Sequence, residues 1–323
     1  MSRLVSAPRD RLSSDDVASV RDLARTSAKR AQWWLRQHGR LERGLHALTQ
    51  LRGPATRYSH ELIVPLTSTY SPWYDDVDFR ATYDSIRTNT FVDQYKCYEL
   101  WEQLGQVTHI DGDILEVGVW RGGTGVLMAR RCAQLGLSTT VYLADTFAGV
   151  AKAGAEDPWY RGGEHADTSP AVVEALAARV GVDVELLVGI FPEDTAHKIA
   201  DRRFRFVHID VDVYDSARDV LDWVWSRLNV GGCVIWDDYG AFECEGVATL
   251  GRELFARHLS CARLVHNVNG HLLLVKLSDA PILDLRTPGS AVRSDFATGG
   301  DGVETALVLA HPDVARPETG AHE

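Results

Sequence analysis

Residues 113–125 read Asp-Ile-Leu-Glu-Val-Gly-Val-Trp-Arg-Gly-Gly-Thr-Gly and set the architecture of this 323-residue chain. Their first half is an apolar run of strand length, and the glycines that follow allow a sharp turn into an amphipathic, helix-like segment. The same alternation of strand and helix recurs along the chain. Repeated strand–helix units predict a parallel sheet with helices on both faces.

The pattern predicts five such units. The predicted strands cover residues 113–120, 140–146, 184–189, 204–210 and 232–237. The predicted helices cover residues 122–134, 170–180, 192–200, 214–228 and 245–258. Two further strand candidates, 263–268 and 271–277, are separated by Asn269-Gly270, a strong hairpin signal. We therefore expect an α/β fold: a doubly wound, mostly parallel seven-stranded sheet with a C-terminal antiparallel hairpin.

The flanking segments differ from this core in composition. Residues 1–60 hold an Arg-rich helical pattern and form the expected N-terminal helical extension. Residues 61–112 read as helices and loops that could cap the ligand edge of the sheet. The main domain is expected over 113–277, and the tail 278–323, rich in Gly, Pro, Asp and Ala, is expected to be partly disordered.

The formal net charge is −11, but it is unevenly distributed. Residues 1–60 contain 12 basic and 5 acidic residues (+7), whereas residues 61–323 contain 22 basic and 40 acidic ones (−18). An acidic body repels phosphate backbones, so nucleic acid is not an expected partner. Trp33-Trp34 among the arginines is more typical of a helix that docks on the body or on a second subunit, which favours a homo-oligomer.

Cysteine usage and hydropathy predict the compartment. Five cysteines without CxxC spacing argue against a disulfide framework and against a zinc site. No apolar run is long enough for a membrane helix or a secretion signal, so a soluble, cytoplasmic protein with no membrane partner is expected.

Ligands of open α/β sheets bind beyond the carboxyl ends of the strands, where this sequence places unusual residues. The glycines of Glu116-Val-Gly-Val-Trp-Arg-Gly122 let the backbone approach a ligand, although no GxGxxG register fits. Asp145 ends the next strand and is either a ribose ligand or a helix cap. Gly189-Ile-Phe191 suits an adenine wall or plain core packing.

Four aspartates follow two neighbouring predicted strands: Asp210, Asp212, Asp237 and Asp238. The spacing of the first pair predicts that both side chains leave one strand face, and the adjacent second pair requires the strand to turn if both reach one ligand. Four converging carboxylates repel one another, and a divalent cation such as Mg²⁺, Mn²⁺ or Ca²⁺ would relieve the conflict. The alternative is that they are solvated turn residues and helix caps.

Two histidines invite a catalytic interpretation. His208 lies in an apolar strand and reads as a buried, satisfied histidine more readily than as a base. His165 lies in the long segment 148–169, whose length indicates a lid over the site, but an ordinary loop histidine is the simpler interpretation.

Taken together, these residues resemble the macrocin O-methyltransferase family, metal-dependent S-adenosylmethionine enzymes that methylate sugar hydroxyls. The similarity runs from about Thr90 to Lys276 and rests on five segments: 116–123, 145–147, 189–195, 210–214 and 231–239. It implies a class I methyltransferase fold of Rossmann-like type, a small-molecule glycoside as substrate, and a place in antibiotic biosynthesis.

The resemblance also implies site residues. It places S-adenosylmethionine at Glu116, Gly118, Val119, Trp120, Arg121, Gly122, Asp145, Thr146, Phe147, Gly189, Ile190 and Asp210. It places magnesium, or manganese, on Asp210, Asp237 and Asp238. It makes Asp212 the general base.

The chemistry suits these residue types, because a sugar hydroxyl is a poor acid that a cation and a carboxylate base can activate. Two alternatives remain at this point: a phenol- or catechol-type O-methyltransferase on the same fold, and a non-catalytic assembly subunit that keeps the fold.

Overall fold

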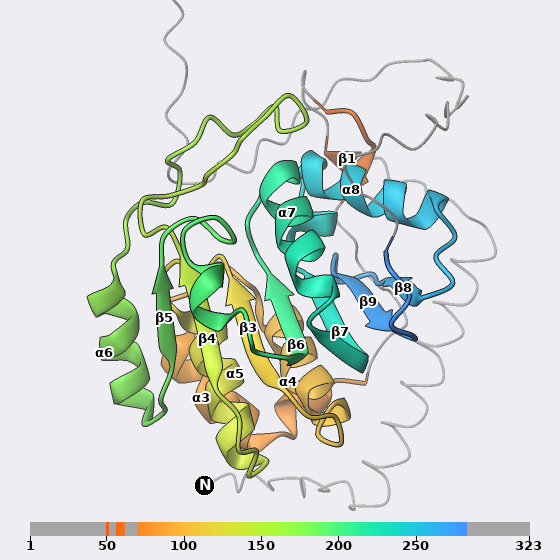
Figure 1. Cartoon of the computed structure of the whole chain (residues 1–323). Helices are drawn as coiled ribbons and strands as arrows, with labels where there is room; N and C mark the ends of the chain where they lie inside the picture. The colour runs from red at the N-terminus through yellow and green to blue at the C-terminus, as the bar shows by residue number, and fades with distance from the viewer. Residues whose placement is uncertain (1–49, 52–55, 62–69, 283–323) are drawn as a thin grey trace, which may run out of the picture. The chain divides into compact units, whose positions relative to one another are not determined.

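The computed structural model describes residues 50–51, 56–61 and 70–282 (Figure 1). The predicted N-terminal extension and the tail lie almost wholly outside these residues. β1 (Gln50–Leu51) and β2 (His60–Glu61) pair antiparallel in a small separate unit. The larger unit holds the other described elements.

Seven strands of the larger unit form one sheet in the order β5-β4-β3-β6-β7-β9-β8. Neighbours from β5 to β7 are parallel, and β9 is antiparallel to both β7 and β8. The strands are β3 (Asp113–Val117), β4 (Val141–Asp145), β5 (Glu185–Val188), β6 (Phe204–Ile209), β7 (Leu228–Trp236), β8 (Ala262–His266) and β9 (Leu272–Lys276). This order confirms the predicted doubly wound, mostly parallel sheet and its C-terminal hairpin.

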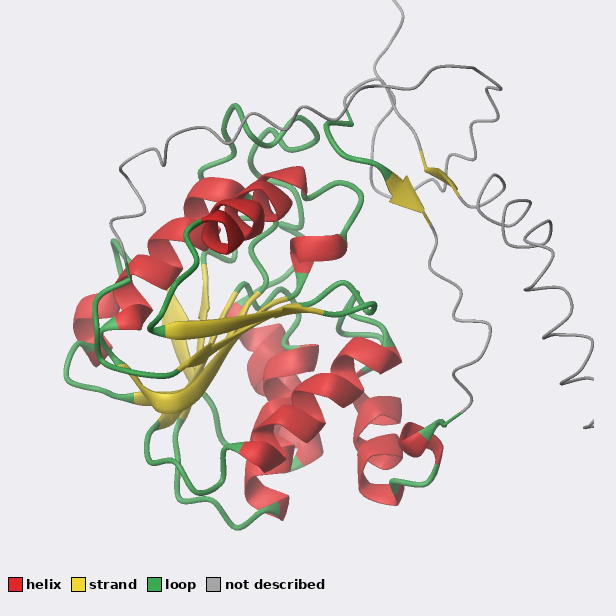
Figure 2. Cartoon of the chain, turned by 90° about the vertical axis from the view of Figure 1, so that its right-hand side faces the viewer, coloured by secondary structure: helices red, strands yellow, loops and turns green. Residues whose placement is uncertain are grey.

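Helices cover both faces of the sheet, which lies between two helical layers in Figure 2. One apolar core joins a sheet face to α3, α4, α5 and α6, and a second joins the other face to α7 and α8. The helices are α3 (Val77–Ile86), α4 (Gln94–Gln106), α5 (Gly123–Gln134), α6 (Pro170–Val180), α7 (Tyr214–Trp225) and α8 (Glu245–Ala256). Short 3-10 turns are η1 (Pro72–Tyr74), η2 (Ala196–Ile199) and η3 (Asp238–Gly240).

The segment between residues 61 and 112 contributes α3 and α4, which lie on the same face of the sheet as α5 and α6. Their apolar sides, which include Phe79, Leu100 and Trp101, are buried against the sheet. Asp93 caps α4, since its carboxylate accepts hydrogen bonds from the backbone N–H groups of Tyr95 and Lys96. The N-terminal end of α4 is thereby fixed, and its Lys96 side chain reaches the carboxyl edge of the sheet.

One predicted helix is wrong. Residues 192–200 form turns and the single 3-10 turn η2, not an α-helix. The link from β5 to β6 has to cross β4 and β3, and Asp194 uses its side chain to accept a hydrogen bond from the backbone of Ile190. A side chain that competes for backbone donors in this way favours turns over helix.

All five cysteines are free, in agreement with the expected lack of a disulfide framework, and all five are buried. Among the described residues, no helix combines the length and the apolar composition that crossing a membrane requires.

Gly118 allows the ends of β3 and β6 to approach each other. Its φ is +87°, and a Cβ atom built there would lie 1.6 Å from the carbonyl oxygen of Asp210. No side chain fits that gap, so the glycine is required both for its conformation and for the contact.

We therefore expect Gly118→Ala to lower the free energy of unfolding by about 3 kcal/mol or more, because strand ends must separate to admit the methyl group. Gly136→Ala is the matched control, since Gly136 also has positive φ (+66°) but nothing within 4 Å of its added Cβ. It should cost only the left-handed penalty of about 1–2 kcal/mol. Equal losses in urea unfolding would contradict the close-approach argument.

Candidate active site

The register of the sheet brings three strand ends together. Beyond the last paired residues, the backbone N–H of Asp210 donates to Val117 (2.9 Å) and that of Asp237 donates to Ile209 (3.0 Å). Gly118, Asp210 and Asp237 therefore follow adjacent strands at one edge. This edge, between β3 and β6, is also where the strand order reverses, the usual ligand position in such sheets.

Three of the predicted carboxylates converge there. Asp210, Asp237 and Asp238 each offer one oxygen, and these atoms lie within 4.8 Å of one another. β7 ends at Trp236, and Asp237 has helical backbone angles (φ −68°, ψ −44°) before η3 begins. The predicted turn between the adjacent aspartates is confirmed, and it lets both side chains reach the same place.

The three carboxyl groups differ in their electrostatic environment. Burial, and then the charges of Asp237 and Asp238, raise the pKa of Asp210 well above its usual value. Burial and the nearby Asp212 raise the pKa of Asp238 to about 7. Burial would also raise the pKa of Asp237, but Lys96 and two histidines hold it well below the usual range. Within the described part of the chain, only Asp237 of the three forms an ion pair, so negative charge is in excess.

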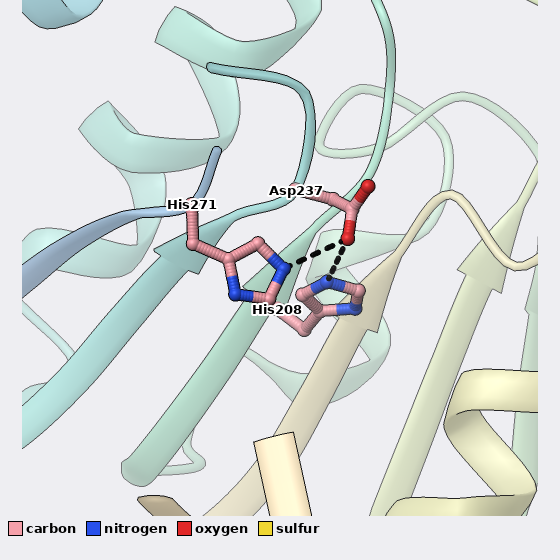
Figure 3. A group of neighbouring side chains, drawn as sticks. All are labelled: His208, Asp237 and His271. Carbon is pink, nitrogen blue, oxygen red and sulfur yellow. Dashed lines mark hydrogen bonds and ion pairs between the residues drawn. The ribbon is translucent and has the colours of Figure 1, made fainter. Parts of the chain in front are cut away.

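Asp237 is held on both oxygens. His271 Nε2 lies 2.9 Å from Oδ1, and Lys96 Nζ donates to Oδ2 and to the main-chain oxygen, both at 2.7 Å. The other ring nitrogen of His271 lies 2.7 Å from Glu99 Oε2, and Asn267 donates to the same Glu99. Figure 3 shows Asp237 between His271 and His208. These contacts fix the orientation of the carboxylate.

His208 is fully buried beneath the site. Its Nδ1 lies 2.8 Å from Glu116 Oε1, while its Nε2 lies 3.8 Å from Asp237 Oδ1, too far for a hydrogen bond. Burial would lower the pKa of His208, but Asp237 and Glu116 raise it to about 9. His208 is buried as expected and its Nδ1 is paired with Glu116, but it is not fully satisfied, because its Nε2 has no hydrogen-bond partner among the described residues. Glu116 is itself wholly buried under the glycine-rich loop.

The side chain of Asp212 does not join that of Asp210 in the three-carboxylate group. β6 ends at Ile209, and Asp212 adopts a left-handed backbone (φ +66°) in which its N–H donates to Asp238 Oδ2 at 2.8 Å. The expectation that Asp210 and Asp212 share one strand face is therefore wrong, because the strand has ended before the second aspartate.

The side chain of Asp212 lies against the loop that follows β4. The Tyr160 hydroxyl donates to Oδ1 at 2.8 Å, and the Cys244 thiol lies 3.5 Å from the same oxygen. Burial raises the pKa of Asp212, hydrogen bonds from Tyr160 and Cys244 lower it, and the outcome is a pKa of about 6. Asp212 thus stands beside the acidic cluster, not within it.

Asp145 holds the glycine-rich loop. Its Oδ2 accepts from the N–H groups of Val119 (2.7 Å) and Trp120 (2.8 Å), and its Oδ1 accepts from Phe147 (2.7 Å). Trp120 and Phe147 both have positive φ, so the loop depends on these bonds. Asp145 is therefore not a helix cap. A carboxylate can accept about four hydrogen bonds, so the three seen here leave room for the predicted contact with a ribose, which stays a prediction.

The remaining predicted residues surround this loop. Gly122 precedes α5 with φ +86°, and a Cβ there would meet Val173 at 2.7 Å. Thr146 donates to Gly149, and Ile190 follows Gly189 (φ +137°) in the turn after β5. Phe191 is core packing, since it is 4% exposed and contacts Trp223 edge-on.

Residues 148–169 lie over the carboxyl edge, as the long yellow-green loop at the upper left of Figure 1. Asp167 accepts from Trp120 Nε1 (2.8 Å) and pairs with Arg121, while Tyr160 reaches Asp212. One loop therefore contacts both the glycine-rich loop and the predicted base.

Sequence reasoning missed the groups that support Asp237. Lys96 is 141 residues from Asp237, and Glu99 is 172 residues from His271. No spacing rule joins such residues. The one available signal was a histidine directly after the Asn269-Gly270 turn, at the start of an apolar strand.

The fold is similar to that of known α/β methyltransferases. The solved structure of the O-methyltransferase NovP is similar over 59% of this chain and 83% of its own, with 25% identity and a TM-score of 0.53. Residues 88–254, just over half of the chain, match the macrocin-O-methyltransferase (TylF) family. The chain belongs to this family, which confirms the resemblance read from the sequence.

Curated relatives are similar over a shorter stretch. One is the 8-demethyl-8-(2,3-dimethoxy-alpha-L-rhamnosyl)-tetracenomycin-C 4'-O-methyltransferase of Streptomyces olivaceus, 34% identical over 42% of this chain and 56% of the relative. Another is the mycinamicin III 3''-O-methyltransferase of Micromonospora griseorubida, 33% identical over 40% and 56%. The chain thus spans a little over half the length of these relatives.

Removing the loop support at Asp145 should be costly. We expect Asp145→Ala to lower the free energy of unfolding by about 2 kcal/mol or more, because three backbone N–H groups lose a charged acceptor. Asp183→Ala, at an exposed loop position, is the control and should change it by less than about 0.5 kcal/mol. Equal effects of the two substitutions in chemical denaturation would show that Asp145 does not hold the loop.

Proposed function

We propose that the protein is an S-adenosylmethionine-dependent, Mg²⁺-dependent O-methyltransferase that acts on a sugar hydroxyl of a glycosylated secondary metabolite. The observation that carries the proposal is the convergence of Asp210, Asp237 and Asp238 beside the glycine-rich loop of a methyltransferase-family fold.

The donor set fits a hard divalent cation. Three carboxylate oxygens within 4.8 Å of one another are ligands of the kind that Mg²⁺ and Mn²⁺ prefer, and their excess charge needs a cation. Asp210, Asp237 and Asp238 would hold the ion. When bound, it would lower the pKa of an acceptor hydroxyl and fix its orientation.

The cofactor would lie on the loop that Asp145 supports. The glycine-rich loop at residues 116–122, together with the strand ends at Asp145–Phe147, Gly189–Ile190 and Asp210, would supply the proposed contacts. S-adenosylmethionine would supply an electrophilic methyl group bound to a sulfonium.

Asp212 is the proposed general base. It would accept the proton of the acceptor hydroxyl as that oxygen takes the methyl group, which S-adenosylmethionine would give up with the bonding electron pair left on its sulfur. Asp212 lies next to Asp238 yet outside the three-carboxylate group, so it can be free to accept a proton. Closure by residues 148–169 would exclude water from this step.

The acceptor class follows from a relative. The relative from Streptomyces olivaceus is named as a methyltransferase of a rhamnosyl-bearing tetracenomycin, which favours a glycoside over a simple phenol here.

Metal dependence is best tested at Asp210, because Asp237 also pairs with Lys96. We expect Asp210→Asn, like EDTA on the wild type, to lower kcat/KM by about 100-fold or more, since the cation's contribution amounts to several kcal/mol. Binding of S-adenosylhomocysteine, measured by calorimetry, should persist in EDTA. Added Mg²⁺ should restore the activity of the EDTA-treated wild type but not that of Asp210→Asn. Full activity in EDTA would refute the metal role.

The base has its own test. Asp212→Asn should lower kcat by about 10²–10⁴-fold, the usual contribution of a general base, while Mn²⁺ binding changes little. Asp183→Asn is a surface control that should keep normal turnover. Near-normal methyl transfer by Asp212→Asn, followed with a glycoside acceptor, would rule out this assignment.

A further inference from the structure

Lys96 occupies an unusual position. It is the third residue of α4, where the helix dipole disfavours a positive charge, and its side chain is only 13% exposed. Neither nearby carboxylate of the same helical segment, Asp93 or Glu99, holds the ammonium group in an ion pair, because Asp93 caps the helix and Glu99 lies against His271. The acidic edge of the sheet favours the ammonium group instead, since Asp237, Asp238 and Asp210 all attract it.

The ammonium group holds one of the two oxygens of Asp237, a member of the three-carboxylate group. His271 Nε2 lies 2.9 Å from Oδ1 of Asp237. Lys96 Nζ lies 2.7 Å from the other oxygen, Oδ2. A cation bound to Asp237 would therefore have to share a carboxylate with Lys96. No other lysine or arginine forms an ion pair with the three clustered aspartates in the described ranges.

We propose that Lys96 is an internal counter-cation: it compensates the acidic cluster in the metal-free protein and competes with the divalent ion for Asp237. The inference rests on the proposed metal site. An ammonium group and a dication that share one carboxylate repel each other, so Lys96 weakens metal binding while it stabilises the metal-free fold.

Lys96 and His271 therefore act on the metal in opposite directions. His271 lies between Asp237 and Glu99, so the Glu99 carboxylate offsets any positive charge on its ring. His271 therefore repels a bound metal ion less than Lys96 does. Its role is to orient Asp237, which makes it a positioning residue. Loss of such support for a metal ligand typically weakens metal binding by about 10–100-fold. Loss of a competing cation strengthens it. The sign of the change separates the two roles.

The test measures Mn²⁺ binding to metal-stripped full-length protein by electron paramagnetic resonance of the free ion. Lys96→Met keeps the apolar stem, and Lys96→Gln keeps a hydrogen-bond donor. Both should bind Mn²⁺ about tenfold more tightly than the wild type or better, whereas His271→Ala should bind it more weakly. Lys152→Met, which removes a lysine paired with Glu193 and Asp219, is the control and should match the wild type.

Thermal melts give a second readout. Without metal, both Lys96 variants should melt below the wild type, and saturating Mn²⁺ should raise their Tm by more than it raises that of the wild type. If a variant folds only with Mn²⁺, the proposal is supported. If it folds under neither condition, Lys96 is a structural residue and the proposal is overturned.

Unchanged or weaker Mn²⁺ binding by the Lys96 variants would also overturn the proposal. The metal site itself can fail separately, as absent Mn²⁺ binding by the wild type. In that case, Mn²⁺ binding by Lys96→Met alone would still support competition between Lys96 and the metal. If neither protein binds Mn²⁺, the proposal is overturned.

Discussion

Buried carboxylates need compensating positive charge, and this requirement organises the carboxyl edge of the sheet. Asp237 is compensated by Lys96 and His271, and its carboxyl pKa is depressed accordingly. Asp210 lies beside it without an ion pair in the described residues, and its pKa is raised. One side of the cluster is therefore balanced from within the protein, whereas the other side carries the carboxyl charge that the proposed cation would balance.

The sequence alone was sufficient to predict the sheet and the residues at the carboxyl edge of its strands. Strands buried on both faces read as continuous apolar runs, so β3, β4, β6 and β7 could be located to within a few residues. The rule that parallel strands present ligands at their carboxyl ends then selected Asp145, Asp210 and Asp237. Both steps rest on local pattern and on a general property of parallel sheets, and neither needs knowledge of tertiary contacts.

The supporting contacts could not be predicted in this way. Lys96 and His271 meet Asp237 from a helix and a hairpin that are distant in sequence, and only the packed sheet brings them together. The predicted direction of the Asp212 side chain was also wrong. The prediction assumed that side chains alternate as in a strand as far as Asp212, but β6 ends at Ile209 and Asp212 has a left-handed backbone. A one-residue difference in a strand end changes where a side chain points. Motifs identified the carboxylates, whereas tertiary packing determined which of them act together.

The loop of residues 148–169 explains why the acceptor is harder to infer than the chemistry. Asp167 contacts Trp120 and Arg121 on the proposed cofactor side, and Tyr160 donates to Asp212 on the proposed base side. A displacement of this loop to admit a bulky glycoside would alter both sets of contacts at once. The carboxylates at the strand ends are fixed by the sheet, but the base takes part of its orientation from the loop. If the proposed roles hold, acceptor selection and the orientation of Asp212 depend on the same segment, which lies outside the regular elements that sequence patterns identify best.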